Sequence, residues 1–394
     1  MRILMIGDYK PQVGGPSNVV QNLARHLSRQ HQLSVINVEE RPYPTGLGHW
    51  LDGNVDVWQE KVSFLDGRVV IPAAIQKTKR AFLLRNQVDL CHAHCPSDAL
   101  VEIINPRKPL VLTLHGYPTP EILLNGTMKP NSLRFRALQW IEKNAIKRAD
   151  AIIVVGMALK KWVIDEFGVD PHKIFYIPNG VNAEEFSLIS HQRRTDLVKK
   201  YNLEDKHCLL FTKHFSPRYG AEYLVKALPQ VIQKYPNTVC IMTNDDPWRE
   251  EIVALADDLD VRENIIFPGR VNFDELVGLY HVSDVYVHPS INNQETFGIA
   301  LIEAMVCEKP VVATAVGGPK EIIERGENVG ILVPPKDPHA IANAVVELLK
   351  DPVKAKEIGR NARKYVESVY TWERVCDETL RVYEYATQVH ANNF

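Results

Sequence analysis

Short apolar runs alternate with amphipathic segments along this chain, and the alternation limits the folds that it can adopt. Residues 2–7 form an apolar run followed by a glycine-bearing loop, residues 17–30 place apolar side chains at helical spacing, and residues 32–38 return as a second apolar run. A strand, a helix and a second strand in this order are the unit of a parallel sheet. Because the alternation recurs down the chain, we expect an α/β protein with parallel sheets covered by helices.

Length and composition indicate a globular protein of two domains. The 394 residues exceed one ordinary domain, so two domains with separate cores are expected. A formal net charge of −2 argues against nucleic acid as a partner. The first residues lack the apolar core of a signal peptide and no apolar run approaches the ~20 residues of a membrane span, so the expected compartment is the cytoplasm. The six scattered cysteines fit reduced, packed thiols.

The stretch from residue 289 to residue 310 combines a polar turn with the start of a helix. Serine, asparagine and glutamine precede Glu295, and from Gly298 onward apolar residues recur at helical spacing. The N-terminus of a helix offers free backbone N–H groups that could hold a diphosphate. At ~1.5 Å per residue, Glu303 lies roughly 7.5 Å beyond Gly298, where the ribose of a bound nucleotide would be. The alternative is a solvated Glu303 on a surface helix.

The same stretch resembles the signature of glycosyltransferase family 4. Glu295 and Glu303 are separated by seven residues that include Phe-Gly-Ile, and Glu-Ala-Met is followed by Lys-Pro-Val-Val. In this family the first glutamate contacts the transferred sugar, and the second binds the ribose hydroxyls of the sugar nucleotide. The expected backbone donors to the diphosphate are four consecutive residues: Thr296, Phe297, Gly298 and Ile299.

The first half of the chain carries further matches to the family. His115 lies in a Thr-x-His-Gly string, whose histidine contacts the donor sugar in the family. Gly14 and Gly15 look like the paired glycines of the family's first loop, where the backbone lies close to the phosphates or the acceptor, with a plain tight turn as the alternative. They do not form the dinucleotide fingerprint. His94 ends an apolar run, and the active sites of parallel sheets gather at such strand ends. A metal site at residues 91–95 is disfavoured because alternate residues of a strand face opposite ways.

One segment of the second domain departs from the family's pattern. Family members usually place an arginine at the end of this domain's first strand and a lysine five residues later, and the two cations neutralise the leaving diphosphate. Here His214 and Tyr219 occupy these positions, whereas Lys213 and Arg218 lie one residue earlier. One step along a strand reverses the side chain, so Lys213 is expected to point away. Arg218 lies in a loop and can reach phosphate, with His214 and Tyr219 as weaker donors, so we expect a rebuilt phosphate site rather than compromised activity.

The resemblance implies a complete architecture and activity. The fold would be GT-B, with doubly wound Rossmann-like domains at 1–177 and 178–369 facing across a cleft, and a C-terminal helix at 370–394 that packs on the first domain. The backbone of Arg270 and Val271 would hold the nucleotide base. The implied enzyme is a retaining glycosyltransferase that moves a sugar from a nucleoside diphosphate sugar to a glycan, lipid or small-molecule acceptor without a metal or other cofactor. An epimerase or hydrolase, or a sugar-nucleotide-binding protein without catalysis, are the alternatives.

Residues 132–147 form a basic amphipathic segment. Arginines and lysines are interleaved with leucine, tryptophan and isoleucine, and a helix of this kind can lie on an anionic membrane surface. Several members of the family glycosylate lipids. The sequence therefore allows peripheral contact with the inner face of a membrane, with a solvated helix face as the alternative.

Overall fold

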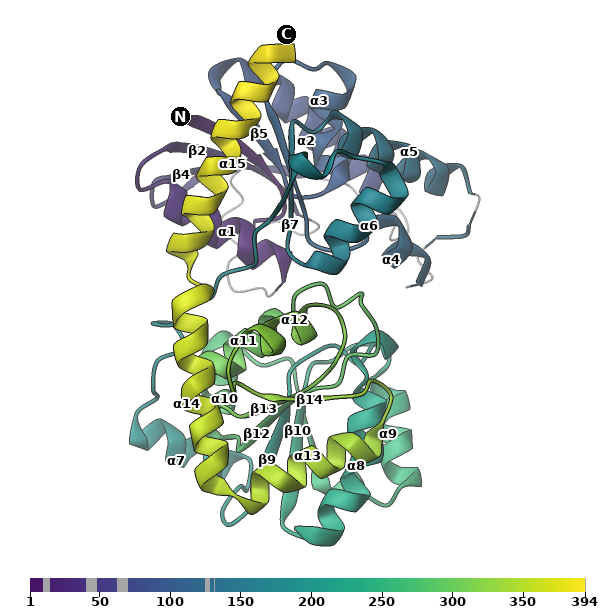
Figure 1. Ribbon diagram of the computed structural model, residues 1–394, viewed down its shortest axis with the longest axis vertical. Coiled ribbons are helices and arrows are strands. Elements are labelled where there is room, and N and C mark those ends of the chain that lie inside the picture. Colours follow the sequence, from purple (N-terminus) through teal and green to yellow (C-terminus); the bar gives the residue numbers. More distant parts are fainter. Residues whose placement is uncertain (10–14, 40–47, 62–69, 125–127, 131, 394) are drawn as a thin grey trace. The chain divides into compact units, whose positions relative to one another are not determined.

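The chain folds into two compact units. The first comprises residues 1–180 and 372–394, and the second comprises residues 181–371. Each unit consists of one sheet with helices on both faces (Figure 1), which confirms the expected α/β class with two Rossmann-like domains. The computed structural model describes these parts of the chain: residues 1–9, 15–39, 48–61, 70–124, 128–130 and 132–393.

The described residues of the first unit form a sheet in the strand order β3-β4-β2-β1-β5-β6-β7-β8. Neighbouring strands are parallel, except that β3 and β4 form an antiparallel hairpin. The strands are β1 (Arg2–Ile6), β2 (Gln32–Glu39), β3 (His49–Asp52), β4 (Val55–Lys61), β5 (Leu90–Ala93), β6 (Leu110–Leu114), β7 (Ala151–Val154) and β8 (Ile174–Tyr176).

Helices cover both faces of this first sheet. Leu4 and Ile6 of β1 share a buried core with α2, α3, α5 and α6. Because alternate residues face opposite ways, His92 of β5 points to the other face, where its ring contacts Tyr383 of α15 and where α1 packs against α15. The helices are α1 (Pro16–Leu27), α2 (Val70–Leu84), α3 (Leu100–Ile104), α4 (Pro118–Leu124), α5 (Leu133–Arg148), α6 (Met157–Phe167) and α15 (Trp372–Asn393), with short 3-10 helices at Arg85–Gln87, Pro96–Ala99 and Pro171–Lys173.

The sheet of the second unit is parallel throughout its described strands, in the order β11-β10-β9-β12-β13-β14. Its strands are β9 (His207–Phe211), β10 (Thr238–Thr243), β11 (Ile265–Gly269), β12 (Val285–His288), β13 (Val311–Thr314) and β14 (Ile331–Val333).

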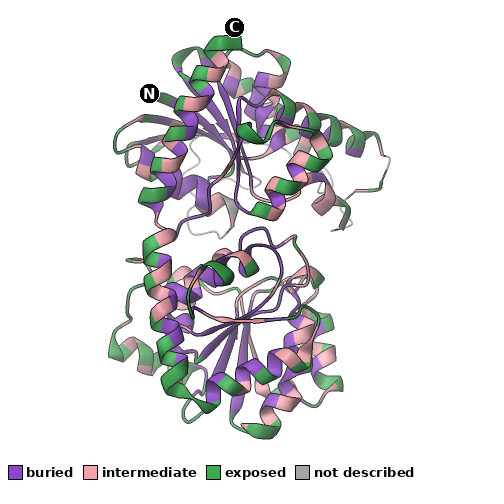
Figure 2. Ribbon diagram, in the orientation of Figure 1, coloured by how far each residue is buried: buried purple, intermediate pink, exposed green. Residues whose placement is uncertain are grey.

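Buried strands and half-exposed helices characterise the second unit as well (Figure 2). Leu209 and Phe211 of β9 pack with α8, α9 and α13 on one face, and α10 and α11 contact the other. The helices are α7 (His191–Lys200), α8 (Ala221–Lys234), α9 (Arg249–Asp258), α10 (Phe273–Val282), α11 (Ile299–Val306), α12 (Gly317–Arg325), α13 (Pro338–Lys350) and α14 (Pro352–Val369), with 3-10 helices at Pro217–Tyr219 and Arg262–Asn264.

In each sheet, strands are added first on one side of the first strand and later on its other side. In the first sheet β2 and β5 lie on opposite sides of β1, and in the second sheet β10 and β12 lie on opposite sides of β9. Ligands of open parallel sheets bind beyond the carboxyl ends of the strands at such a switch point. The loops after β1 and β5, and those after β9 and β12, are therefore the places where each unit is expected to hold a ligand.

Candidate functional site

A buried ion pair occupies the switch point of the second sheet. Lys213, two residues after the end of β9, places its Nζ atom 2.9 Å from Oε2 and 3.1 Å from Oε1 of Glu295, which belongs to the loop after β12. The side chains are only 14% and 8% exposed. An ammonium and a carboxylate that are this close and this shielded stabilise each other in their charged forms.

Two more groups of β12 and its loop surround the carboxylate of Glu295. The hydroxyl of Ser290 donates to Oε2 at 3.3 Å, and Nε2 of the buried His288 lies 3.6 Å from the same atom. Burial alone would raise the pKa of Glu295, but Lys213 and His288 outweigh it and hold this pKa well below its usual range. Glu295 is therefore a fixed anion.

Two glycines at the start of α12 allow the loop that carries Glu295 to approach closely. The N–H of Gly318 donates to the carbonyl of Glu295 at 2.9 Å, and that of Gly317 donates to the side chain of Asn293 at 3.0 Å. A Cβ atom on Gly317, whose φ is +43°, would lie 2.1 Å from the Glu295 carbonyl oxygen. Side chains at these two positions would displace the loop, so the glycines fix the position of Glu295.

Two cations lie close to the aromatic ring of Tyr219. Nζ of Lys213 is 4.5 Å and the guanidinium carbon of Arg218 is 4.7 Å from the ring centroid, and Arg218 also donates to the Tyr219 hydroxyl at 2.7 Å. Such contacts hold cations near a ring face. The tyrosine that replaces the family's lysine thus positions two neighbouring positive charges.

The prediction that Lys213 points away from this site was wrong. It assumed that the strand continues through His214, but β9 ends at Phe211, and beyond that point residues need not alternate between faces. His214 instead lies 3.2 Å from Asp246, and its side chain is half-exposed. Asp246 also accepts the N–H of Phe215 at 2.7 Å, which fixes the turn that sends Lys213 to Glu295.

Glu303 lies on α11 within a chain of hydroxyl groups. The hydroxyl of Tyr280 donates to Oε2 of Glu303 at 2.9 Å and lies 3.1 Å from the hydroxyl of Thr212, which is also 3.1 Å from that of Tyr286. Burial raises the pKa of Glu303, while the Tyr280 hydrogen bond and Lys213 oppose the rise. This chain of groups links the loop after β9 to the second glutamate.

The remaining residues of the expected donor site surround the start of α11 and the end of β11. The helix begins at Ile299, one residue later than expected, because Gly298 has a φ of +96° and forms the N-cap. Thr296 and Phe297 are buried. Arg270 and Val271 directly follow β11, with the Arg270 side chain exposed. The structure thus brings Glu295, Glu303 and the helix start together, while the roles of Arg270 and Val271 stay predictions.

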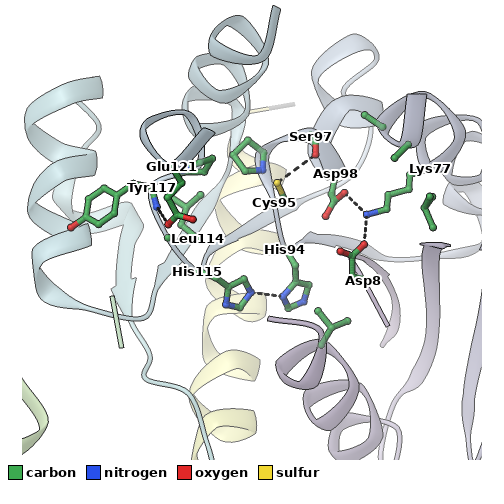
Figure 3. A pocket seen from close by; sticks show the side chains of 17 residues that line it. Asp8, Lys77, His94, Cys95, Ser97, Asp98, Leu114, His115, Tyr117 and Glu121 are labelled. Carbon is green, nitrogen blue, oxygen red and sulfur yellow. Dashed lines mark hydrogen bonds and ion pairs between the residues drawn. The ribbon is translucent and has the colours of Figure 1, made fainter. Parts of the chain in front are cut away.

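The first unit has a pocket of about 420 Å³ at its own switch point (Figure 3). The buried ammonium of Lys77, on α2, lies 2.9 Å from Asp98 and 3.2 Å from Asp8, which follows β1. Burial and the nearby Asp8 raise the pKa of Asp98 to about 6, although Lys77 lowers it. Two carboxylates and one ammonium thus form one wall of the pocket.

Two histidines form the base of the same pocket. Nδ1 of His94 lies 3.1 Å from Nε2 of His115, and the two rings stack 5.4 Å apart. Burial lowers the pKa of His115 to about 4 and lowers that of His94 well below its usual value. Both rings are therefore neutral at physiological pH and can exchange hydrogen bonds with a ligand.

The expected glycine pair is only partly described. Gly14 lies outside the residues that the structure describes. Gly15 has a φ of +77° and forms the N-cap of α1, with open space around the position of a Cβ atom. A contact of either glycine with phosphate or acceptor stays a prediction.

Two family models match the chain. The model described as Glycosyltransferase Family 4 matches residues 13–185, and the model described as Glycosyl transferases group 1 matches residues 193–365. An uncharacterized glycosyltransferase of Methanocaldococcus jannaschii is 30% identical, with 99% of each chain covered. The chain belongs to glycosyltransferase family 4. The resemblance seen in residues 289–310 is thereby confirmed, and with it glycosyl transfer from sugar nucleotides as the activity of the family.

Other relatives of this family 4 glycosyltransferase are more distant. A GDP-mannose-dependent alpha-(1-6)-phosphatidylinositol monomannoside mannosyltransferase of Mycolicibacterium smegmatis is 24% identical over 94% of each chain. A sucrose-phosphate synthase from Thermosynechococcus elongatus superimposes with a TM-score of 0.81 at 22% identity, covering 99% of both chains. HepE of Anabaena in complex with UDP superimposes with a TM-score of 0.76 at 20% identity, covering 98% of this chain and 100% of the other. These likenesses confirm the GT-B fold.

The sequence did not single out the charged wall of the first-unit pocket in this family 4 enzyme. Asp8 could have been found from its place directly after the first apolar run, since ligand groups gather at the ends of parallel strands. Lys77 could not have been found in this way. Its spacing in the sequence places it on the same helix face as the buried Ala74 and Ala81, and such a face predicts packing in the core rather than ligand binding. Within the described residues, no group of three or more histidine, cysteine or acidic side chains is arranged to hold a metal ion.

Proposed function

We propose that this family 4 glycosyltransferase transfers a sugar from a nucleoside diphosphate sugar, bound by the second unit, to an acceptor bound by the first. The pair of Lys213 and Glu295 carries the proposal. It offers a fixed anion for sugar hydroxyls and a cation for phosphate at the switch point of a parallel sheet. The relatives fit this choice of donor, since one is named as GDP-mannose-dependent and another was solved with UDP.

In the proposed reaction the bond between the anomeric carbon and the diphosphate oxygen breaks, and its electron pair leaves with the diphosphate. An acceptor hydroxyl oxygen bonds to the anomeric carbon on the same face, and its proton passes to the departing diphosphate. Lys213, Arg218 and the N-terminal turn of α11 would stabilise the charge on the leaving group, so no metal is needed in this proposal. In this proposal Lys213 and Arg218 supply the positive charge, each from one residue before the position that the family usually uses.

The other expected residues receive orienting roles in the proposal. Glu295 would accept hydrogen bonds from the sugar and Glu303 from the ribose hydroxyls, as the family's signature implies. The backbone of Arg270 and Val271 would hold the base. Tyr219 positions the two cations, and His214 contributes through the turn that it forms with Asp246.

A thermal-shift screen tests the donor site. UDP, GDP and ADP are compared with their common sugar conjugates, because a ligand that binds only the folded state raises the apparent stability. We expect one nucleotide family to raise the melting temperature and the other two to leave it unchanged. No shift with any nucleotide would contradict the proposal, and donor turnover that proceeds equally without any acceptor would indicate a hydrolase or an epimerase instead.

Peripheral membrane contact is a further part of the proposed function. No helix within the described residues is both long and apolar enough to cross a membrane. On α5, however, Leu133 is 84% and Trp140 is 55% exposed, and both lie on a face with exposed Arg136, Lys143 and Lys147 at helical spacing. Exposed apolar groups among basic ones suit the surface of an anionic bilayer. Co-sedimentation with anionic vesicles that is lost in the double variant Leu133→Ser/Trp140→Ser would support this contact, and equal sedimentation of both proteins would exclude it.

A further inference from the structure

The lining of the first-unit pocket, as far as the structure describes it, carries a net negative charge. Asp8, Asp98 and Glu121 place three carboxyl groups on the lining described by the structure, and Lys77 places one ammonium there. The histidines of the pocket are neutral at physiological pH because burial lowers their pKa values. The described lining therefore has about two more negative than positive charges, and Figure 3 shows these groups around one space.

The ammonium of Lys77 is already neutralised by its neighbours. It is held between Asp98 at 2.9 Å and Asp8 at 3.2 Å, and its side chain is only 8% exposed. A ligand phosphate that approached Lys77 would first have to displace one of these carboxylates or be held beside them. Like charges at such short range repel, and they do so more strongly near a protein surface than in bulk water.

His94 belongs to the uncharged part of the pocket lining. Its side chain is 7% exposed, and because burial lowers its pKa well below the usual value, the ring adds no positive charge to the lining.

We infer that the first-unit pocket binds an uncharged, hydroxyl-rich group and discriminates against its phosphate ester. Hydroxyls donate to the carboxylates of Asp8, Asp98 and Glu121. The apolar part of the lining, which includes Val20, Ala74 and Leu114, covers the carbon skeleton. A volume of about 420 Å³ lies in the ~300–1,000 Å³ range of small-molecule sites. The inference rests on the proposed function in one respect, which is that this ligand is identified as the acceptor.

Direct binding to the full chain, without any donor, tests the assignment. The probes are glucose, mannose, galactose and myo-inositol, each compared with its monophosphate ester by saturation-transfer NMR titration. We expect at least one polyol to bind and its phosphate ester to bind on the order of tenfold more weakly, because the ester adds negative charge to an acidic pocket. Equal or tighter binding of the esters would overturn the inference, and so would the absence of binding by every polyol.

The substitution Asp8→Asn identifies the pocket as the binding site. Asp8 is half-exposed, so the variant should fold, and it removes one of the negative charges. In this variant the ratio between the Kd of the phosphate ester and the Kd of the polyol should decrease several-fold. Asp165→Asn is the matched control, because Asp165 is exposed on α6 and does not line the pocket. Equal effects of the two variants would place the polyol elsewhere and overturn the assignment.

The nucleotide screen separates this inference from the proposed function. A preparation that is stabilised by a nucleoside diphosphate but binds none of the polyols overturns the inference and leaves the donor site standing. A preparation that binds a polyol in an Asp8-dependent way but no nucleotide overturns the proposed transfer reaction and leaves the pocket standing.

Discussion

At the scale of single residues, a one-place offset in sequence does not by itself determine which way a side chain points. The sequence shows histidine and tyrosine where the family usually has arginine and lysine, and strand geometry alone predicts that Lys213 faces away. The end of β9 at Phe211 and the hydrogen bonds to Asp246 reverse that orientation. These interactions join residues that are far apart in sequence, so no local pattern could reveal them.

The role proposed for Lys213 can be measured by nucleotide affinity. In the variant Lys213→Met, the diphosphate loses a cation and the carboxylate of Glu295 remains buried without its main counter-charge. Hydrogen bonds to charged groups contribute ~1.5–3 kcal/mol, so the Kd for the nucleoside diphosphate should rise at least about tenfold in calorimetric titration. Lys226→Met is the control, because Lys226 is exposed on α8, where it pairs with Glu222 and lies over the ring of Tyr223. Unchanged affinity in the Lys213 variant would refute its role in phosphate binding.

At the scale of elements, the loops after the strands determine the sites, and the sequence predicts them unevenly. Residues 289–310 combine turn-forming residues with a clear helical pattern, so the start of α11 was predicted to within one residue. The wall formed by Asp8, Lys77 and Asp98 comes from a loop, a helix and a 3-10 turn. These three residues come together because of the order of the strands in the sheet, and this order cannot be derived from the spacing of apolar residues in the sequence.

The close contact between the start of α12 and the loop before α11 predicts a stability effect. In Gly317→Ala the new Cβ atom would lie 2.1 Å from the carbonyl oxygen of Glu295, at a residue with positive φ. Backbone strain alone costs ~1–3 kcal/mol, and the overlap adds to it, so the second unit should unfold at a clearly lower urea concentration. Gly269→Ala is the matched control, since Gly269 has a φ of +75° but open space around its Cβ position. An equal decrease of the urea midpoint in both variants would show that this contact does not contribute to the stability of the second unit.

At the scale of the whole molecule, the two units place their candidate sites in the same way. In each, strands are added on both sides of the first strand of a largely parallel sheet, and charged side chains gather beyond the strand ends at that point. The alternation of strands and helices predicted the parallel sheets, but it did not predict the strand order, because the side of β1 on which β5 is added depends on long-range packing. The second unit thereby gains a fixed ion pair and the first an acidic pocket.

The buried histidines of both units predict a loss of stability in mild acid. Burial lowers the pKa values of His92, His94 and His115 in the first unit and of His281 and His288 in the second. The unfolded chain binds these protons near pH 6.5, whereas folded His115 binds its proton only near pH 4. The contribution of these histidines to stability is therefore complete above about pH 6.5 and falls as the pH decreases toward 4, by up to ~1.4 kcal/mol per pH unit for each histidine.

The contribution of a single histidine can be isolated by measuring urea unfolding between pH 7 and pH 5. Because His115→Gln removes one group that takes up a proton on unfolding, the free energy of unfolding should depend less steeply on pH, by about 1 kcal/mol per unit below pH 6. The variant His172→Gln, at an exposed position of the same unit, should keep the slope of the unsubstituted protein. An unchanged slope in the His115 variant would mean that this imidazole is already protonated in the folded protein, and the neutral pair assigned to the pocket would be wrong.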